Sequence, residues 1–392
     1  MNKLGSLAIT GIGMVSPLGE DASSLLAALD ARRSGIVEVN EAPLPQPSWA
    51  GRVGEFSYQG LIPAMRARRL DRASLFAVVA AHRAVASAGL TGAPLLEHQL
   101  GVVMGTGSAG SGPLTVFLDA LYRRSPQDAP PFEFPNTVAN APASHVSIEL
   151  GLKAANTTLS HSEAVMGIAL ATGRLMIADG RCSHLLVGAV DEWNPYYDLG
   201  YRQLGALRRC QHGGGGTVLS EGATALVAEL PATAAERGAP VLATLSGVGV
   251  SSAPGEPFRW VADRSALRRA IHAALEDAEL EPAQVGSVFL AANGLEAMEK
   301  LEAEVLGEIF STPLAATGIK GAVGERACSG ALSLAVATLA RHRGTLPPYA
   351  GGALNRWPKP IQILETPTSR PPGATLVVLY GFGGNFAALV VT

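Results

Sequence analysis

The stretch Asn156-Thr-Thr-Leu-Ser-His-Ser-Glu-Ala-Val-Met-Gly167 places a carboxylate, Glu163, where a helix is expected to begin. The positive end of a helix dipole stabilises an anion there by about 0.3–1 kcal/mol. Glu163 can therefore be a structural residue that caps the helix, or it can belong to a chemical site. His161 and Ser162 do not complete a catalytic triad with it, because three consecutive residues cannot form the required relay within one turn.

The composition is that of an ordinary globular protein. The chain has 392 residues, of which 47% are hydrophobic and 16% are charged, and its net charge is −3. This length is sufficient for two core-forming units or for one large layered domain. The small net charge and the scattered Lys and Arg residues indicate neither disorder nor a nucleic-acid-binding surface. No nucleic-acid partner is expected.

Several features bear on the compartment. The three cysteines, Cys182, Cys210 and Cys328, are odd in number and lack the spacing of metal ligands, which fits a reducing cytosol. The longest apolar runs, such as residues 75–81, are far shorter than a bilayer span, and the N-terminus is a poor signal peptide. We expect a soluble cytoplasmic protein with no membrane partner, no bound metal and no cofactor.

The order of elements predicts an α/β fold, because short β-rich runs alternate with longer helical runs. A strand is expected over Ser6–Gly11 and a helix over Leu70–Gly89, and Pro231–Pro240 has the composition of a polar connector. After it the series restarts, which predicts two similar halves, residues 1–235 and 236–392, without a repeat strong enough to prove duplication. Further strands are expected over Gly101–Met104, Leu185–Val190, Ala223–Ala228, Val241–Val250, Val288–Ala292, Leu376–Leu379 and Ala387–Val391, and further helices over Ala266–Ala278, Glu299–Phe310 and Ala327–Arg341.

One glycine-rich loop has the sequence pattern of a nucleotide-binding site. Gly105-Thr-Gly-Ser-Ala-Gly110 follows an expected strand and formally matches the dinucleotide-binding fingerprint. The helix that should begin inside it is interrupted by Gly112-Pro113, and no strand ending in an acidic residue follows at the proper distance. A nucleotide is therefore not expected to bind this loop.

Several short segments spread over most of the chain form a recognisable series. They are Ala8–Gly19, Arg68–Arg72, Ala86–Leu90, Pro135–Val138, His145–Ser147, Leu150–Lys153, the Ser-Glu-Gly-Ala turn Ser220–Ala223, and the glycine-rich loop Tyr380–Asn385. Each segment alone is weak evidence, whereas all of them in this order strongly resemble the β-ketoacyl-acyl-carrier-protein synthases of the elongating type, in which the last loop is a gating loop. The resemblance implies the thiolase fold, a five-layer αβαβα sandwich that works as a dimer.

The resemblance implies that the condensing site has been lost. Glu163 stands where active members carry the cysteine that takes the acyl chain as a thioester, and a carboxylate cannot form that bond. In the first histidine motif the histidine is replaced by Asn293, and the threonines that hold the phosphopantetheine arm are replaced by Leu295 and Ala297. No catalytic residues are expected. The vestigial site would consist of Glu163, Asn293, Lys320, Glu325 and Phe382.

The second motif retains Lys320, and Glu325 replaces the histidine five residues later. If the fold holds, Glu163, Lys320 and Glu325 converge on one buried pocket, where they share charge or one carboxylate stays protonated. A structural ion cluster is preferred to an acid–base site, because ion networks also perturb pKa values. Cys328, near this motif, is expected to be a small core residue rather than an exposed thiol.

Within this family, subunits that lack the nucleophile are best known as the chain length factors of iterative type II polyketide systems, and this chain resembles them. Those subunits pair with an active ketosynthase, meet an acyl carrier protein through the complex, and form half of the tunnel for the growing acyl or polyketide chain. Many carry Gln where this chain has Glu163, so the carboxylate is a departure. The resemblance places the tunnel wall in Gly107–Tyr122 and Pro131–Pro135, although an ordinary core face is an equal alternative. The expected tunnel residues are Leu114, Phe117, Leu118, Leu121, Phe132 and Phe134.

Two other functions stay open. The chain can be an enzyme in its own right that uses Glu163, Asn293 and Glu325 for hydrolysis, dehydration or cyclisation of an acyl-carrier substrate. It can also be a homodimeric protein that binds an acyl carrier protein without chemistry. Turnover by the isolated chain favours the first of these, and co-purification with a ketosynthase favours the chain length factor.

Overall fold

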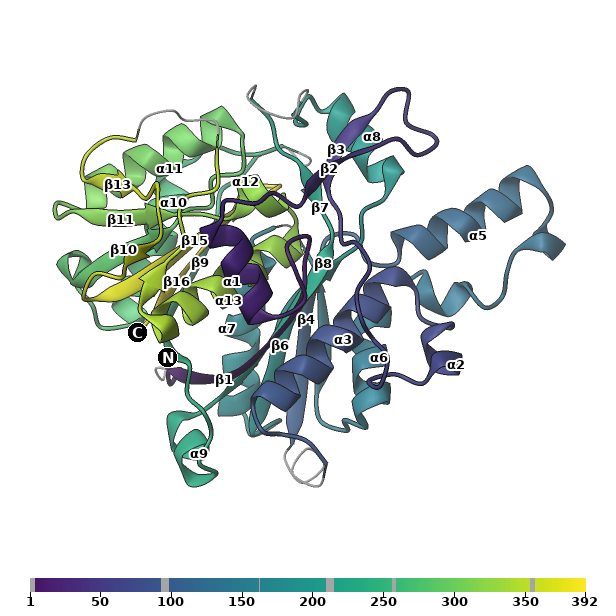
Figure 1. Cartoon of the computed structure of the whole chain (residues 1–392), viewed down its shortest axis with the longest axis horizontal. Coiled ribbons are helices and arrows are strands. Elements are labelled where there is room, and N and C mark those ends of the chain that lie inside the picture. Colours follow the sequence, from purple (N-terminus) through teal and green to yellow (C-terminus); the bar gives the residue numbers. More distant parts are fainter. Residues whose placement is uncertain (1–3, 93–98, 162, 209–214, 256–258, 353–356) are drawn as a thin grey trace.

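The computed structural model describes residues 4–392 apart from 93–98, 162, 209–214, 256–258 and 353–356. Its main feature is a mixed sheet of 11 strands in the order β13-β11-β10-β15-β16-β9-β1-β8-β6-β4-β5. Two halves of this sheet are joined where β1 pairs with β9 over three residue pairs, Leu7–Ile9 with Ala243–Leu245. Helices cover both halves (Figure 1).

The first half of the sheet is closely covered by a helix on its outer side. Its strands are β1 (Leu7–Val15), β8 (Gly222–Glu229), β6 (His184–Asp191), β4 (Leu100–Thr106) and β5 (Asn156–Ser160). All nine residues of β1 are buried, and helix α3 (Arg72–Ser87) packs on the strand. A Cβ atom on Gly11 or Gly13 would lie about 2 Å from the carbonyl oxygens of Ala84 or Ala80, so these glycines permit the close approach. Helix α6 (Ala141–Leu150) joins the same core.

The second half of the sheet repeats this arrangement. Its strands are β9 (Ala243–Ser252), β16 (Asn385–Val391), β15 (Ala374–Gly381), β10 (Val285–Phe289), β11 (Leu314–Thr317) and β13 (Ile361–Ile363). Helices α10 (Arg264–Asp277) and α11 (Glu296–Ile309) share one hydrophobic core with these strands. The apolar face of α10 carries Leu267, Ile271 and Leu275, which recur at helical spacing.

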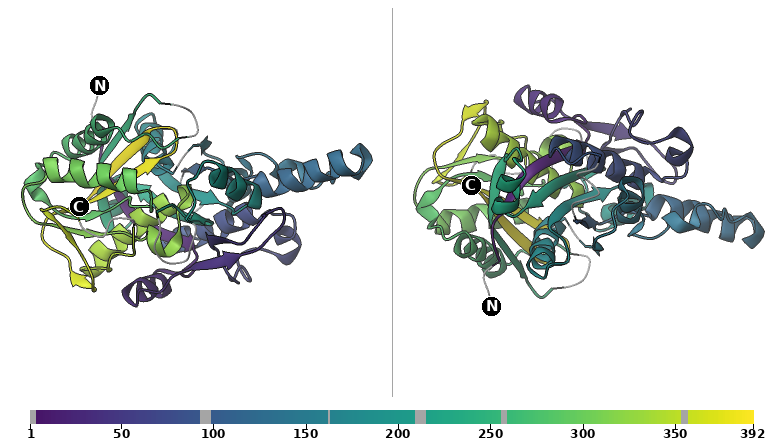
Figure 2. Two further views of the ribbon diagram at one scale, coloured as in Figure 1. Left: turned by 90° about the horizontal axis from the view of Figure 1, so that it is seen from above. Right: turned by 90° about the horizontal axis from the view of Figure 1, so that it is seen from below.

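Two helices fill the space between the two halves of the sheet. Helices α7 (Val165–Ala178) and α13 (Ala327–Arg343) contribute to one core with strands from both halves. Buried residues occur all around α13, as is typical of a helix enclosed on every side. The layers are therefore helices, sheet, helices, sheet and helices, which confirms the predicted thiolase-like αβαβα sandwich (Figures 1 and 2).

One local prediction was wrong, and another is made more precise. The segment Pro231–Pro240 lies between β8 and β9, as expected of a connector, and it contains a short helix, α9 (Pro231–Glu236), which begins at a proline that fits the first turn. Helix α5 (Ser111–Arg123) begins directly after the Gly105–Gly110 loop and includes Gly112-Pro113 in its first turn. This pair does not interrupt the helix, because the first-turn N–H groups have no intrahelical partner to lose.

Helix α5 projects from the body of the molecule and forms an arm with the segment that follows it (Figures 1 and 2). Of its residues, Pro113 and Ala120 are buried. The arm, which we define as residues 111–138, exposes large hydrophobic side chains that a single chain leaves open to water. They are Leu114, Val116, Leu118, Tyr122, Phe132, Phe134 and Val138.

The remaining elements are short or connect the layers. They are α1 (Ala22–Asp30), β2 (Ile36–Val39), β3 (Ser48–Gly51), α2 (Ala64–Ala67), η1 (Pro126–Asp128), η2 (Phe134–Asn136), α8 (Pro195–Gln203), β7 (Leu219–Ser220), η3 (Pro282–Gln284), α12 (Lys320–Val323), β12 (Thr345–Leu346) and β14 (Thr368–Ser369). Within the described part of the chain, none of the helices combines the length and the apolar character that crossing a membrane requires.

Candidate functional site

Glu163 lies in the turn between β5 and α7, at the centre of the molecule, with 3% of its surface exposed. Its Oε1 accepts a hydrogen bond from the Tyr201 hydroxyl at 2.9 Å, and its Oε2 accepts one from the backbone N–H of Phe382 at 2.9 Å. Helix α7 has Ala164 as its N-cap and no side-chain cap. Of the two alternatives for Glu163, capping of the helix is therefore not the one adopted, because both carboxylate oxygens are directed to other elements.

A buried arginine completes the surroundings of this carboxylate. Arg326 Nη1 donates to the Tyr201 oxygen at 3.0 Å, so that Arg326, Tyr201 and Glu163 form a chain of hydrogen bonds. Burial alone would lower the pKa of Arg326, but the neighbouring Tyr201, Asp191 and Glu163 raise it above its usual value. Burial and the charge of Glu163 raise the pKa of Tyr201 well above 10, so the tyrosine remains a neutral donor.

Three aromatic rings pack against one another next to Glu163. The Tyr201 and Phe382 rings are stacked with centroids 5.6 Å apart, and Trp260 meets Phe382 edge-on at 4.7 Å. Trp260 also meets Tyr201 edge-on at 5.5 Å. Since Glu163 holds both Tyr201 and the backbone of Phe382, the carboxylate fastens the glycine-rich loop to α8.

Glu163 borders a cavity of about 590 Å³ that has aromatic and polar walls. Its lining includes His161, Tyr197, Arg326 and Phe382. Burial lowers the pKa of His161, while Glu163 opposes the shift, so the imidazole is neutral near pH 7. Ser162, the third member of the rejected triad, lies outside the described residues.

A second cavity, of about 460 Å³, contacts the arm. Tyr196 and Tyr197 line this cavity as well as the one at Glu163, so the two tyrosines lie between the two spaces. Leu114 and Leu118 of α5 form part of its apolar wall, as does Tyr122. The tyrosine pair therefore separates the cavity at Glu163 from the cavity at the arm.

The structure divides the six expected tunnel residues into two groups. Leu114 and Leu118 line the cavity beside Tyr197, whereas the Phe117 ring packs on the Phe134 ring with centroids 5.5 Å apart. Phe132 is 85% exposed, and Leu121 is half-buried. The described lining of this cavity does not include the other four expected residues, Phe117, Leu121, Phe132 and Phe134.

Lys320 and Glu325 form a buried ion pair, with Nζ 2.9 and 2.7 Å from the two carboxylate oxygens. Burial raises the pKa of Glu325 to about 8, and Glu163 adds to this shift while Lys320 opposes it. A second buried acid, Glu302, also has its pKa raised to about 8 by burial. Glu302 lies outside the Lys320–Glu325 motif, and for Glu163, Glu325 and Lys320 the sequence predicts either shared charge or one protonated carboxyl.

Glu163 acts on the pKa of Glu325, which contacts Lys320, so the three residues that were expected to converge influence one another. Glu163 lines one cavity, Asn293 and Lys320 line another, and Leu295 and Ala297 line a third of about 500 Å³. The second and third of these cavities share Gly216 in their linings. In the described part of the chain, no group of three or more His, Cys, Asp or Glu residues could hold a metal ion.

Asp191, Tyr201 and Arg326 are site residues that the sequence did not reveal. Asp191, at the end of β6, accepts hydrogen bonds from the N–H groups of Gly107 at 2.8 Å and Cys328 at 2.9 Å. It thereby ties the glycine-rich loop to the start of α13. Arg326 directly follows Glu325 in the sequence. Its position next to this motif residue was the one feature of the sequence that could have pointed to Arg326. Cys328 is buried as predicted, and Cys210 lies outside the described residues.

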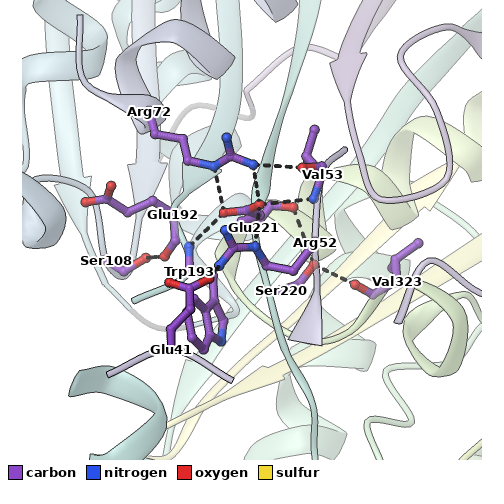
Figure 3. A network of polar contacts seen from close by, with 10 residues as sticks. All are labelled: Glu41, Arg52, Val53, Arg72, Ser108, Glu192, Trp193, Ser220, Glu221 and Val323. Carbon is purple, nitrogen blue, oxygen red and sulfur yellow. Dashed lines mark hydrogen bonds and ion pairs between the residues drawn. The ribbon is translucent and has the colours of Figure 1, made fainter. Parts of the chain in front are cut away.

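The segment Ser220–Ala223 carries a buried carboxylate, Glu221, that several residues bind (Figure 3). Glu221 is fully buried, and Arg72 donates to both of its oxygens, at 3.0 and 2.7 Å. The N–H groups of Val53 and Trp193 donate to the same carboxylate at 3.0 and 3.2 Å. Two of the sequence segments that carry the family resemblance therefore meet in one ion pair.

Family models match most of the chain. The description "Beta-ketoacyl synthase, N-terminal domain" fits residues 5–232, and "Beta-ketoacyl synthase, C-terminal domain" fits residues 242–352. The chain belongs to the β-ketoacyl synthase family. In this family, the 3-oxoacyl-[acyl-carrier-protein] synthase 2 of Vibrio harveyi is 29% identical over 297 residues, which are 71% of each chain.

Two solved β-ketoacyl synthase structures share the fold over nearly the whole length. The ishigamide ketosynthase/chain length factor superposes with a TM-score of 0.89 at 24% identity, covering 99% of this chain and 98% of the other. The AntDE:AntF complex, a type II polyketide synthase acyl-carrier protein with its ketosynthase bound to the hexaketide, superposes with a TM-score of 0.85 at 20% identity and 99% coverage of both chains.

Proposed function

We propose that this β-ketoacyl synthase family member is a non-condensing subunit of the chain length factor type, which pairs with an active ketosynthase and shapes the tunnel for the acyl chain. The observation that carries the proposal is Glu163 at the position of the nucleophile, with both oxygens engaged by Tyr201 and Phe382. A carboxylate has no route to the acyl thioester. Asn293 and Glu325 stand where the two histidines are expected.

The arm supports the pairing. Leu118 and Tyr122 are 36% and 80% exposed, and they line a cavity that is separated from the vestigial site by a tyrosine pair. A partner that covers residues 111–138 would bury this apolar surface and enclose the cavity. Obligate interfaces of this kind exceed about 2,000 Å². One solved structure of the same fold is named as a ketosynthase/chain length factor, and another contains an acyl-carrier protein.

The arrangement at Glu163 argues against an independent hydrolase, dehydratase or cyclase. A general base needs an oxygen within hydrogen-bond reach of the substrate proton. Here both Glu163 oxygens already accept hydrogen bonds, from the Tyr201 hydroxyl and the Phe382 N–H, and the residue is 3% exposed. A homodimeric carrier-binding protein would use the same arm, so only the identity of the partner separates it from the proposal.

The test is co-expression with the ketosynthase encoded nearest to this chain that retains Cys, His and His. We expect a one-to-one heterodimer by size-exclusion chromatography with light scattering, and aggregation of this chain when it is expressed alone. Leu118→Asp should prevent the pairing, whereas Val241→Asp, at an exposed residue outside the arm, should not. A stable monomer at micromolar concentration would contradict the proposal, and a stable homodimer that ignores the ketosynthase would favour the carrier-binding protein.

A further inference from the structure

The base of the arm is attached to the body of the molecule largely by polar contacts. Helix α5 packs mainly on η1 and η2, which are parts of the arm itself, and Phe117 packs on Phe134 within it. Of the α5 residues, Pro113 and Ala120 are the buried ones. Few apolar side chains of α5 therefore hold it on the body, and the hydrogen bonds at the start of the helix account for much of the attachment.

Glu192, which directly follows β6, is the acceptor at the start of α5. Its side chain is buried, and its Oε1 accepts hydrogen bonds from the Gly112 N–H at 2.6 Å and from the Ser111 hydroxyl at 3.1 Å. Gly110, the N-cap residue of α5, provides no side-chain cap. Because the first-turn N–H groups of a helix need an acceptor from outside the helix, Glu192 supplies one from 80 positions away. It thereby joins the arm to the body.

The segment that contains Glu192 also contributes to the wall of the cavity beside the arm. Asn194 Nδ2 donates to Thr115 Oγ1 of α5 at 3.3 Å, and Tyr196 and Tyr197 line the same cavity as α5. Since Glu192 lies in this segment and holds the start of α5, it fixes how these two parts of the cavity wall lie relative to each other.

The surroundings of Glu192 disfavour its ionised form. Both donors to its carboxylate are neutral groups. The charged groups that face it are Asp71, at the start of α3, and Glu221. Arg72 binds Glu221, and the Glu192 carboxylate points away from this pair (Figure 3). Burial, with Asp71 and Glu221 adding to its effect, raises the pKa of Glu192 to about 7, although the two hydrogen bonds oppose the shift.

We propose that Glu192 is a proton-dependent anchor of the arm, which holds α5 most firmly when its carboxyl group is protonated and more loosely when it is ionised. The protonated carboxyl keeps an oxygen that accepts the Gly112 N–H, and it places no negative charge next to Asp71 and Glu221. The proposal does not rest on the pairing with a ketosynthase, because each of these contacts lies within this chain.

The sign of the pH dependence follows from the two states of the arm. In the attached arm the pKa of Glu192 is about 7, whereas in a released arm the solvated carboxyl has its ordinary pKa of 4.5. The attached arm therefore holds a proton that the released arm gives up, and attachment weakens as pH rises from about 4.5 to about 7. Between pH 6 and pH 8 these two values correspond to a loss of about tenfold.

Hydrogen exchange of peptides that span residues 111–124, followed by mass spectrometry at pH 6 and pH 8, tests the proposal in the assembly in which the chain is soluble. After correction for intrinsic exchange, these amides should exchange about tenfold faster at pH 8 in the parent. Glu192→Gln keeps an acceptor for the Gly112 N–H and cannot ionise. Its corrected exchange should be equal at both pH values, and slower than that of the parent at pH 8.

Two further variants separate anchoring from proton dependence. Glu192→Ala removes the acceptor, so its amides should exchange about fivefold faster than those of Glu192→Gln at both pH values. Glu55→Gln makes the same chemical change at an exposed position outside the arm and should keep the pH dependence of the parent.

Corrected exchange that is equal at pH 6 and pH 8 in the parent overturns the proton dependence. A Glu192→Gln variant that keeps the pH dependence of the parent overturns it as well. Equal exchange in Glu192→Ala and Glu192→Gln overturns the anchoring role. Because all variants are compared in one assembly, these outcomes are independent of whether that assembly contains a ketosynthase.

Discussion

Replacing Glu163 with alanine should release the loop that carries Phe382. The Phe382 N–H donates to Glu163 Oε2 at 2.9 Å, and hydrogen bonds to charged acceptors contribute about 1.5–3 kcal/mol each. Because each 1.4 kcal/mol corresponds to about a factor of ten, the Phe382 amide should exchange its hydrogen about 10–100-fold faster in the variant. Hydrogen exchange followed by mass spectrometry of peptides that span residues 380–385 measures this directly.

Two controls separate this effect from general loosening. Tyr201→Phe removes the other hydrogen bond to Glu163 but keeps the acceptor for Phe382 N–H, so its effect on this amide should be smaller. Glu55→Ala, at an exposed position, should have none. If Glu163→Ala folds and exchange over residues 380–385 is unchanged, the carboxylate does not hold the loop and the reasoning fails.

Two further predictions concern pH and product length. Burial raises the pKa of Glu302 to about 8 from an ordinary 4.5, so the folded chain holds a proton that the unfolded chain releases between these values, and stability should fall as pH rises through this window. Glu302→Gln keeps an acceptor for Ala291 N–H and should reduce the dependence of the free energy of unfolding on pH, measured by urea unfolding at pH 5, 6.5 and 8. An unchanged dependence would show that other groups cause the loss of stability. In the reconstituted pair, Leu118→Ala should lengthen the acyl products at a largely unchanged condensation rate, and Phe117→Ala should do so less, because Leu118 lines the cavity and Phe117 packs on Phe134. Equal product distributions by mass spectrometry for both variants and the parent would show that this helix does not set the length.

The α/β class was predictable from local patterns, and the thiolase-like layering was predicted from the family resemblance. Strand β1 and helix α3 are visible as an apolar run and a 3.6-residue period, and the proximity of Lys320 and Glu325 was expected from the family's second motif. The interruption expected at Gly112-Pro113 was wrong because the pair falls in the first turn of α5, where a proline costs no hydrogen bond.

Local patterns in the sequence do not give the hydrogen-bond partners of Glu163. The family resemblance placed Phe382, 219 positions away, in the same site, whereas Tyr201, 38 positions away on α8, was not predicted. Leu118 and Phe117 are adjacent on one helix, and only the packing of Phe134 shows that they face different surroundings.

The central claim is that this chain does not carry the acyl group itself. Intact-protein mass spectrometry of the reconstituted pair, after incubation with malonyl and acyl carrier proteins, tests it directly. We predict an acyl adduct on the ketosynthase partner and none on this chain, and Glu163→Cys in this chain should not produce turnover without the partner, because Asn293 and Glu325 still replace the histidines. An acyl adduct on the unaltered chain, together with condensation by the chain alone, would contradict the account.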